Sequence, residues 1–388
     1  MWYPARAEQA GPMSDLSELL QRHVDAGTLP GAVAVHRHRG GTETVAVGVQ
    51  DLDTGTPMAP DTLFAIASVT KPITAFAALL LVADGTLAIT DPVTRWLPEL
   101  VDPRVLRDPH GPIEDTVAAH RQITVEDLLT LRNGLGFPGD FTGPVMDRLI
   151  SDLSEGSALP PGSEPDTWLT AAGRIPLLHQ PGEGYSYNTG SALLGLLVGR
   201  ASGQGLDGFL IERVFEPLGM TDARWWVPAD QRHRFATRYA PTDDPTRLTV
   251  SDPVDGAWAA PPAFPNGAGG LVCTADDWLR FGTMLLCGGA HENEQLLPRE
   301  LVAAMMTDQL TDAQRASAGV FLAGGQGWGY GGSTRADGSY GWDGGTGTTA
   351  RVNPRTGQVS ILFTQIEMLD PQPTPLVTEF ESFVRAAV

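Results

Sequence analysis

The strongest constraint on the fold is the position of the β-rich segments, which occupy the two ends of this 388-residue chain. Residues 31–40 and 42–55 are β-rich runs joined at Gly40-Gly41, a hairpin signal. After residue 325 the sequence alternates again and turns at Gly, Asn-Pro and Thr-Gly, which predicts three or more antiparallel strands. Because strands need partners, we predict an α+β fold. Its N- and C-terminal strands form one antiparallel sheet, flanked by terminal helices, with a mostly helical region inserted.

Helical patterns account for the two termini and most of the middle. The predicted helices span residues 14–27, 72–85, 123–137, 191–203, 206–220, 274–289 and 374–387. Thr124 and Asp127 are spaced as an N-cap and its partner. The second helix is almost entirely apolar, so we expect it to be buried. Residues 138–168 are rich in Gly, Pro, Asp and Ser, and we expect a long excursion over a cleft there.

These patterns predict a single folded unit over residues 14–388. Its α/β part is expected at about 14–66 and 270–388, and its helical part at about 67–269. Residues 1–13 have no apolar segment of the kind found in secretory signals, so we expect a disordered leader and a cytoplasmic location.

The net charge of −20 argues against nucleic acid or an anionic membrane as a partner. No apolar run reaches the length of a membrane span. The two cysteines, Cys273 and Cys287, are expected to be reduced and structural. The sequence does not indicate an oligomeric state.

Lys71 is the only lysine, because 25 of the 26 Lys and Arg residues are Arg. A coding bias toward Arg would replace Lys wherever charge alone matters. Arg stays protonated in proteins, whereas a desolvated Lys can lose its proton. The surviving lysine is therefore either a chance survivor on the surface or a deprotonable amine that the chemistry requires. From this fact alone the two explanations are equally good.

Ser68 lies three residues before Lys71, in the stretch S-V-T-K at the predicted start of the buried helix. Residues i and i+3 share a helix face, so the Lys71 amine can reach the Ser68 hydroxyl. Burial would lower the pKa of Lys71 and make it a general base for a serine nucleophile. The S-x-x-K spacing is weak evidence alone. However, the chain has no G-x-S-x-G elbow, H-E-x-x-H metal site, P-loop or dinucleotide fingerprint.

With these residues the chain resembles the serine β-lactamase and penicillin-binding-protein superfamily on its class C side, and most closely the family VIII carboxylesterases. The resemblance runs from about residue 14 to the end. It implies that Ser68 is the nucleophile and Lys71 its basic partner. The stretch G-Y-S-Y-N-T-G-S-A-L-L-G (184–195) resembles the family's tyrosine motif. Alignment on Leu194-Gly195 favours Tyr187 as the catalytic tyrosine, with Tyr185 as the competitor.

The third motif of the resemblance is Y-G-W-D-G-G-T-G-T, residues 340–348. It implies a strand beside the nucleophile, with the N–H groups of Ser68 and Gly345 forming an oxyanion hole. The substrate-binding residues that it implies are Trp342, Asp343, Gly344, Asn188 and Tyr185. Aromatic residues that could contribute to the pocket are Trp225, Trp226, Trp258, Phe264 and Trp328, most of which we expect in the core.

Two departures from the family pattern decide the predicted substrate. Penicillin-recognising members carry Asn two residues after the tyrosine, whereas here Asn188 follows Tyr187 directly. They also use Lys or His where this chain has Trp342, so a cation for the substrate carboxylate is missing. We therefore predict a serine hydrolase that works through an acyl-enzyme on neutral, small or apolar esters, without metal or cofactor.

Several alternatives remain open from the sequence. Within the same fold the chain could be a weak β-lactamase, a D-amino-acid peptidase or a natural-product acyltransferase. From a different class, it could be an inactive binding module. The predicted partner is a small-molecule ester or amide.

Overall fold

A seven-stranded antiparallel sheet forms the base of the molecule, which we describe from a computed structural model covering residues 14–157, 159–244 and 247–387. The strand order is β11-β12-β13-β14-β15-β1-β2. The strands are β1 (Gly31–His38), β2 (Gly41–Gly48), β11 (Gly327–Trp328), β12 (Ser333–Thr334), β13 (Tyr340–Gly344), β14 (Thr348–Asn353) and β15 (Gln358–Thr364). The leader expected at residues 1–13 lies outside the described residues.

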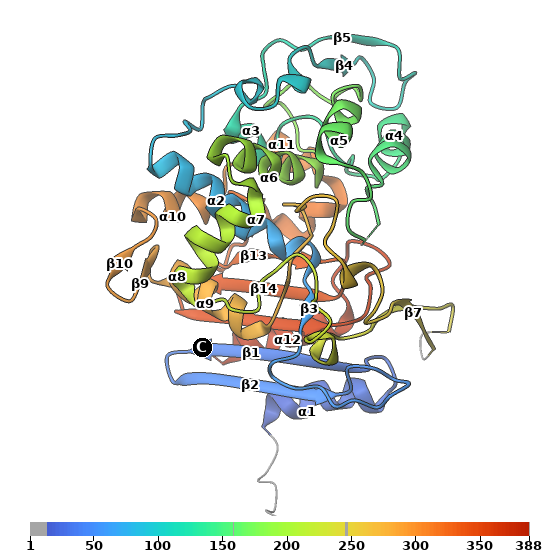
Figure 1. The fold of residues 1–388 in the computed structure, drawn as a ribbon, viewed down its shortest axis with the longest axis vertical. Coiled ribbons are helices and arrows are strands. Elements are labelled where there is room, and N and C mark those ends of the chain that lie inside the picture. The colour runs from blue at the N-terminus through green and yellow to red at the C-terminus, as the bar shows by residue number, and fades with distance from the viewer. Residues whose placement is uncertain (1–13, 158, 245–246, 388) are drawn as a thin grey trace, which may run out of the picture.

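The two ends of the chain meet in the middle of this sheet. Strand β1 pairs with β2 on one side, where His38 lies opposite Gly41, and with β15 on the other, where Ala32 lies opposite Thr364. Figure 1 shows the N-terminal hairpin in blue beside the C-terminal strands in red. The predicted antiparallel sheet built from both termini is confirmed.

Each face of the sheet carries its own hydrophobic core. On one face lie the terminal helices α1 (Asp15–Asp25) and α12 (Pro375–Ala386), whose apolar residues cluster with Ala34 and Leu362. On the other face lie α9 (Ala275–Leu286) and the helical region, which cluster with Ile361 and Phe363. Neighbouring residues of β15 thus belong to different cores, as the period of a strand requires.

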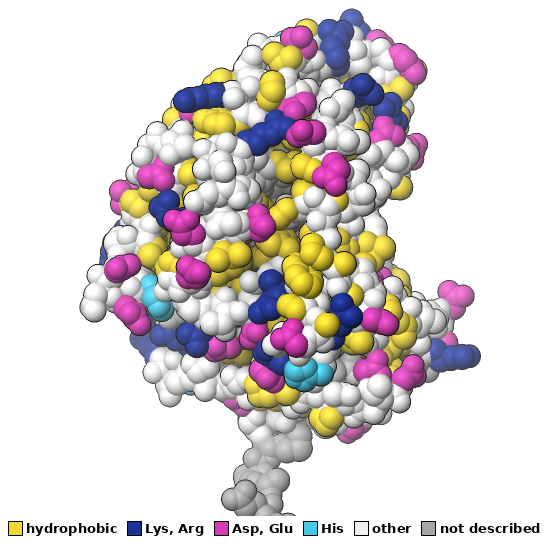
Figure 2. All heavy atoms as spheres, viewed as in Figure 1, with side chains coloured by type: hydrophobic (Ala, Val, Ile, Leu, Met, Phe, Trp, Pro, Cys, Tyr) yellow, Lys and Arg dark blue, Asp and Glu magenta, His cyan; other side chains and the backbone are white. Residues whose placement is uncertain are grey.

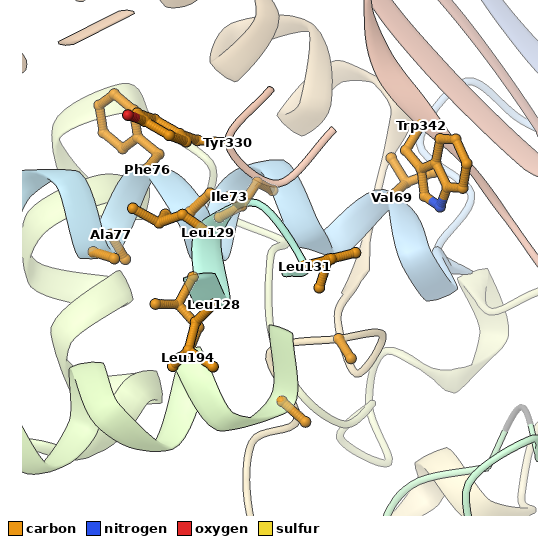
Figure 3. Close-up of a cluster of buried hydrophobic side chains, with 14 of the residues drawn as sticks. Val69, Ile73, Phe76, Ala77, Leu128, Leu129, Leu131, Leu194, Tyr330 and Trp342 are labelled. Carbon is orange, nitrogen blue, oxygen red and sulfur yellow. The ribbon is translucent and has the colours of Figure 1, made fainter. Parts of the chain in front are cut away.

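The helical region is built around α2 (Lys71–Ala83), which is buried along its first eleven residues. Figure 3 shows Ile73 and Phe76 of this helix among Leu128, Leu194 and Tyr330, which come from three other segments. The other helices are α3 (Val125–Leu129), α4 (Pro144–Leu153), α5 (Pro165–Ala172), α6 (Thr189–Ser202), α7 (Gly205–Leu210), α8 (Glu216–Leu218), α10 (Arg299–Met305) and α11 (Asp312–Ser317). None of the helices in the described ranges is long and apolar enough to cross a bilayer.

The helix expected over 123–137 is much shorter in the structure. Thr124 and Asp127 form the predicted capping box, but α3 ends at Leu129. Leu131 then adopts a positive φ of 55° and Gly134 one of 86°. The chain turns there so that Phe137 can form a β-bridge with Tyr187. Tertiary pairing therefore overrides the helical pattern, and it brings this segment to Tyr187.

Four two-stranded sheets accompany the large sheet within the described residues. They are β3 (Phe64–Ala65) with β8 (Val272–Cys273), β4 (Arg104–Leu106) with β5 (Thr116–Ala118), β6 (Arg238–Pro241) with β7 (Leu248–Asp252), and β9 (Ala290–His291) with β10 (Glu294–Gln295). The first of them ties the segment before α2 to the segment before α9. The division into an α/β part and a helical part at residues 66–67 and 269–270 stays a prediction.

Candidate active site

Ser68 lies on a sharp corner between strand β3 and helix α2. A 3₁₀ turn, Ala67–Thr70, leads directly into α2 at Lys71, and Pro72 occupies the first turn where its missing N–H costs little. Ala67 has a φ of +44°, a conformation that non-glycine residues rarely adopt. Such strain persists only where the surroundings hold it, and it is common at functional sites.

The corner is held by the turn that joins β13 to β14. Thr346 Oγ1 donates to the Ala65 carbonyl at 2.6 Å, and Thr348 Oγ1 donates to the Ile66 carbonyl at 2.9 Å. These bonds fix the backbone immediately before Ser68 to the third sequence motif. The nucleophile predicted from residues 68–71 and the glycine-rich turn predicted beside it are thus neighbours.

The Lys71 side chain is fully buried, and its amine makes three polar contacts. Nζ lies 2.8 Å from Ser68 Oγ, 2.9 Å from Asn188 Oδ1 and 2.6 Å from the Ala268 carbonyl. Burial lowers the pKa of Lys71 to about 7, against the opposing attraction of Glu155. A neutral amine has two N–H groups and one lone pair. Because the carbonyl and the amide oxygen can only accept, the lone pair of the neutral amine faces Ser68.

Tyr187 supplies the second polar contact of Ser68. Its hydroxyl donates to Ser68 Oγ at 3.0 Å and accepts from the Trp342 indole Nε1 at 2.5 Å. Burial raises the pKa of Tyr187, so the phenol keeps its proton at neutral pH. With neutral Lys71 the hydrogen bonds run in one direction, from Trp342 through Tyr187 and Ser68 to the lysine.

Tyr185 lies away from this group. Its ring packs edge-on against Trp328 at 5.7 Å between centroids, and it does not line the pocket around Ser68. Its hydroxyl is buried without a hydrogen-bond partner in the described part of the chain. The structure therefore brings Tyr187, and not Tyr185, to the nucleophile.

Asn188 occupies a strained turn between Tyr187 and helix α6. Its φ of +77° and ψ of −71°, with the Thr189 N–H donating to the Tyr187 carbonyl at 3.1 Å, define a γ-turn of the rarer type. The side chain contacts Lys71 through Oδ1 and Glu155 through Nδ2, the latter at 3.1 Å. Asn188 lines the pocket, but its polar atoms point to these two side chains.

Glu155 is the site residue that sequence reasoning missed. It follows α4 directly, where Ser154 adopts a left-handed conformation and the Glu155 N–H donates to the Leu149 carbonyl. Its Oε2 accepts from Asn188 and from Thr189 Oγ1 at 2.8 Å, and burial raises the pKa of Glu155 to about 7. No motif distinguishes it from the other acidic residues, because only the fold brings it to Asn188.

The third motif lies beside Ser68, and its residues differ in what they contact. Trp342 bonds Tyr187, while Asp343 is held by Arg351 at 2.8 Å. A Cβ on Gly344 would lie 2.6 Å from the Ile66 carbonyl, so glycine permits the close approach. Gly345 lines the pocket, and its N–H donates to no acceptor among the described residues.

Ser68 opens into a pocket of about 600 Å³, within the range of small-molecule sites. Of the aromatic residues expected there, Trp258 lines it, whereas Trp225, Trp226, Phe264 and Trp328 do not. Phe141 of the aromatic wall belongs to the excursion expected over the cleft. Phe137 and Phe321 were not expected there, and the Phe321 ring stacks on Tyr187 with 4.3 Å between centroids.

The outer part of the pocket is apolar, and its charges are acidic. Leu159 from the predicted excursion, Val320 and Leu369 line it and are exposed at its rim. Figure 2 shows hydrophobic side chains gathered around the hollow on this face. Among the described lining residues no Lys or Arg occurs, and the charged ones are Asp343, Glu367 and Asp370. Within the described ranges no group of three His, Cys, Asp or Glu could hold a metal ion.

Comparison with known proteins identifies the family of this chain. The model of the Beta-lactamase family matches residues 16–373. Esterase EstB from Burkholderia gladioli is 38% identical over 319 residues, which are 78% of this chain and 74% of EstB. Protein Rv1367c from Mycobacterium tuberculosis (strain ATCC 25618 / H37Rv) is 43% identical over 292 residues, 75% of this chain and 71% of that protein.

A solved structure supports the same fold. EstCE1, described as a hydrolase with promiscuous acyltransferase activity, superposes with a TM-score of 0.77 at 22% identity, covering 96% of this chain and 97% of its own. The predicted β-lactamase/transpeptidase-like fold is confirmed, as is the resemblance to its esterase members. The chain belongs to the beta-lactamase family.

Proposed function

We propose that this protein is a serine carboxylesterase that acts through an acyl-enzyme on neutral, apolar esters. One observation carries the proposal: a buried lysine amine lies 2.8 Å from Ser68 Oγ, at a pocket whose described lining has no cation. The family match and the esterase relative confirm the coarser prediction of a serine hydrolase. The roles of individual residues are our proposal.

In the proposed acylation step, Ser68 Oγ attacks the ester carbonyl and forms a tetrahedral intermediate. Its proton passes to the lone pair of neutral Lys71, which the described contacts aim at the serine. The backbone N–H groups of Ser68 and Gly345 hold the oxyanion. Tyr187, which stays protonated because it is buried, relays a proton to the leaving alkoxide and regains one from Lys71. The alcohol departs and the acyl group stays on Ser68.

Deacylation repeats these steps with water. The water gives its proton to the Lys71–Tyr187 pair as its oxygen attacks the acyl carbonyl. Ser68 Oγ then leaves with a proton, and the carboxylic acid is released. In this scheme the polar atoms of Trp342 and Asn188 do not bind the substrate. The Trp342 indole donates to Tyr187, and the Asn188 amide contacts Lys71 and Glu155.

The charge of the pocket supports a neutral substrate. A carboxylate on the substrate would find no Lys or Arg among the described lining residues, whose acids are Asp370 and the ion-paired Asp343 and Glu367. A charge-assisted contact of the missing kind is worth about 1.5–3 kcal/mol. The apolar rim and the aromatic wall favour an ester with an apolar acyl or alcohol group.

Acyl transfer to an alcohol is the second candidate. The pocket of about 600 Å³ has room for an acyl group and a second small molecule. Transfer and hydrolysis differ only in which nucleophile attacks the acyl-enzyme. Incubation with an ester and a range of alcohols, with both acid and new ester measured, separates the two.

A panel of p-nitrophenyl esters of increasing chain length, assayed beside nitrocefin, tests the proposal. We expect turnover of esters with a preference for apolar acyl groups, and little turnover of nitrocefin. Ser68→Ala is the control and should abolish both ester turnover and labelling by a fluorophosphonate. Nitrocefin turnover well above that of every ester would contradict the proposed ester substrate. An unlabelled Ser68 in folded protein would contradict the proposal that the protein is a serine hydrolase.

We also propose a cytoplasmic location, a small-molecule partner, and no role for nucleic acid or membranes. Cys273 and Cys287 are both free thiols, and Cys287 is exposed, which suits a reducing compartment. The net charge of −20 disfavours anionic polymers and surfaces. Redox-sensitive labelling of Cys287 in cell extracts and fractionation of the native host would test the location.

A further inference from the structure

We propose that Glu155 is a positioning residue of the active site. It orients the Asn188 amide toward Lys71, and its carboxylate, on the other side of that amide from the lysine amine, favours the protonated form of Lys71. This inference rests on the proposed role of Lys71 in activating Ser68. It extends the site to a residue 33 positions before Asn188 in the chain, on the loop that follows α4.

The first part follows from the hydrogen bonds of one amide. Glu155 Oε2 accepts from Asn188 Nδ2 at 3.1 Å, and Asn188 Oδ1 accepts from Lys71 Nζ at 2.9 Å. The ionised form of Glu155 cannot donate, so it selects the amide orientation in which nitrogen faces the carboxylate and oxygen faces the lysine. The reversed amide would present N–H groups to Lys71 and compete for the lone pair that Ser68 needs.

The strained turn shows why such an orienting contact is needed. Asn188 has a positive φ and sits at the centre of a γ-turn, a conformation that costs free energy. The Glu155 carboxylate contacts both Asn188 and the next residue, because Thr189 Oγ1 donates to the same Oε2 at 2.8 Å. Glu155 therefore accepts hydrogen bonds from two consecutive residues of the turn, Asn188 and Thr189. Lys71 donates to the oxygen of the Asn188 amide, on the other side of the same side chain.

The second part follows from charge in a buried site. Glu155 is 8% exposed, and its Oε1 has no hydrogen-bond partner in the described part of the chain. Its negative charge acts on Lys71 and opposes the effect of burial on the lysine pKa. The other ionisable groups facing this site are Tyr187, whose ring lies 4.7 Å from Nζ, and Asp343, which acts on Tyr187 and is paired with Arg351.

Glu155→Gln tests the charge while it keeps the shape. Without the negative charge, protonated Lys71 is less stable, so its pKa falls and the neutral base exists at lower pH. We expect the midpoint of the acidic limb of kcat/KM to move down by about one pH unit, with KM changed less than about threefold. An unchanged or raised midpoint in folded Glu155→Gln protein would overturn the proposal.

Three further variants separate the effect of the Glu155 charge from its effect on the orientation of the Asn188 amide, and one of them is a control. Glu155→Ala removes the orienting oxygen and should lower kcat about 10- to 100-fold with little change in KM. Thr189→Val removes one donor to Oε2, makes Glu155 easier to protonate, and should move the midpoint in the same direction as Glu155→Gln. Glu126→Gln is the matched control, because its carboxylate pairs with Arg132 on a partly exposed face, and it should leave the midpoint in place.

Fluorophosphonate labelling keeps this test independent of the substrate. The rate of Ser68 labelling is followed against pH in wild-type and Glu155→Gln protein, with circular dichroism as the check of folding. If the wild type is labelled but hydrolyses no ester, the proposed substrate fails while the labelling profile still tests Glu155. Superimposable labelling profiles would contradict the proposal even in an active esterase.

Discussion

At the scale of single residues, the site depends on the direction of three hydrogen bonds. The Trp342 indole can only donate, so the Tyr187 hydroxyl accepts from it and donates to Ser68. Ser68 is then left to donate to the Lys71 lone pair. An amine with a pKa of about 7 is poised for this role at neutral pH, as a general base should be. Activity should therefore rise with pH as Lys71 loses its proton.

Replacing the lone lysine by arginine tests whether the amine has to lose its proton. Lys71→Arg keeps a positive charge and donors, but the guanidinium stays protonated and is bulkier than the fully buried amine that it replaces. We expect kcat for a p-nitrophenyl ester to fall at least about 100-fold across pH 6–9. Lys71→Met is the companion variant without donors, and it should be similarly inactive. Near wild-type activity in Lys71→Arg would show that a proton acceptor is not needed at residue 71.

The two tyrosines of the second motif offer a matched pair. Tyr187→Phe removes the donor to Ser68 and should lower kcat about 100-fold or more. Tyr185→Phe removes a buried hydroxyl without a partner among the described residues, so activity should stay within about threefold and stability should hold or rise. The measurements are kcat for one ester and the midpoint of urea unfolding. A larger loss of kcat in Tyr185→Phe than in Tyr187→Phe would reverse our assignment.

At the scale of elements, Ser68 is held by segments that are far apart in the chain. Strand β3 ends three residues before it, at Ala65, and pairs with β8, so Phe64 lies opposite Cys273. Helix α9 begins immediately after β8 with a complete capping box formed by Thr274 and Asp277. The cap fixes where β8 ends and α9 starts, and α9 in turn packs on the sheet. Local capping thus supports the strand pair next to the nucleophile.

Thr274→Ala should cost about 1 kcal/mol of unfolding free energy, because it leaves the Asp277 N–H without its capping partner. Urea unfolding followed by tryptophan fluorescence measures the change. Thr311→Ala makes the same substitution in the capping box of α11, which is six residues long and buries only Gln314, and it should cost less. An equal or greater cost for Thr311→Ala would contradict the importance of the cap on α9.

At the scale of the whole molecule, the sheet separates two hydrophobic cores, and only one of them reaches the pocket at Ser68. The core under α1 and α12 contains Leu362, whereas the core on the other face contains Phe363 and continues to Tyr187 and Trp342. The residues that we propose for catalysis therefore lie on one side only. Among the described residues, none from α1 or α12 lines the pocket around Ser68.

Leu362→Ala should separate stability from activity. The side chain is fully buried in the core of the terminal helices, so its loss should lower the free energy of unfolding by about 2–5 kcal/mol. At 20 °C, where the variant remains folded, kcat and KM for an ester should equal those of the wild type. Denaturant unfolding and steady-state kinetics on the same sample measure both. A change in kcat larger than about threefold would show that the two cores are coupled.

Features that depend on near neighbours could be predicted from the residues alone. The spacing of Ser68 and Lys71 brings the two side chains together on one turn, and the same kind of local interaction produces the capping boxes at Thr124 and Thr274. The alternating ends of the chain indicated the antiparallel sheet. The family resemblance supplied Tyr187 and the motif around Trp342, which local chemistry could not have connected to Ser68.

Features that depend on the path of the chain could not be predicted. Ser68 and Tyr187 are 119 residues apart, and Glu155 reaches Asn188 across 33 residues through an excursion without a motif. The end of α3 and the aromatic wall at Phe321 depend on the same long-range packing. The amino-acid sequence thus accounts for the contact between the lone lysine and Ser68, since their spacing at the start of a helix places the hydroxyl beside the amine. The lowered pKa of Lys71 and the contact of its amine with the Ala268 carbonyl depend on burial, which many distant segments create together.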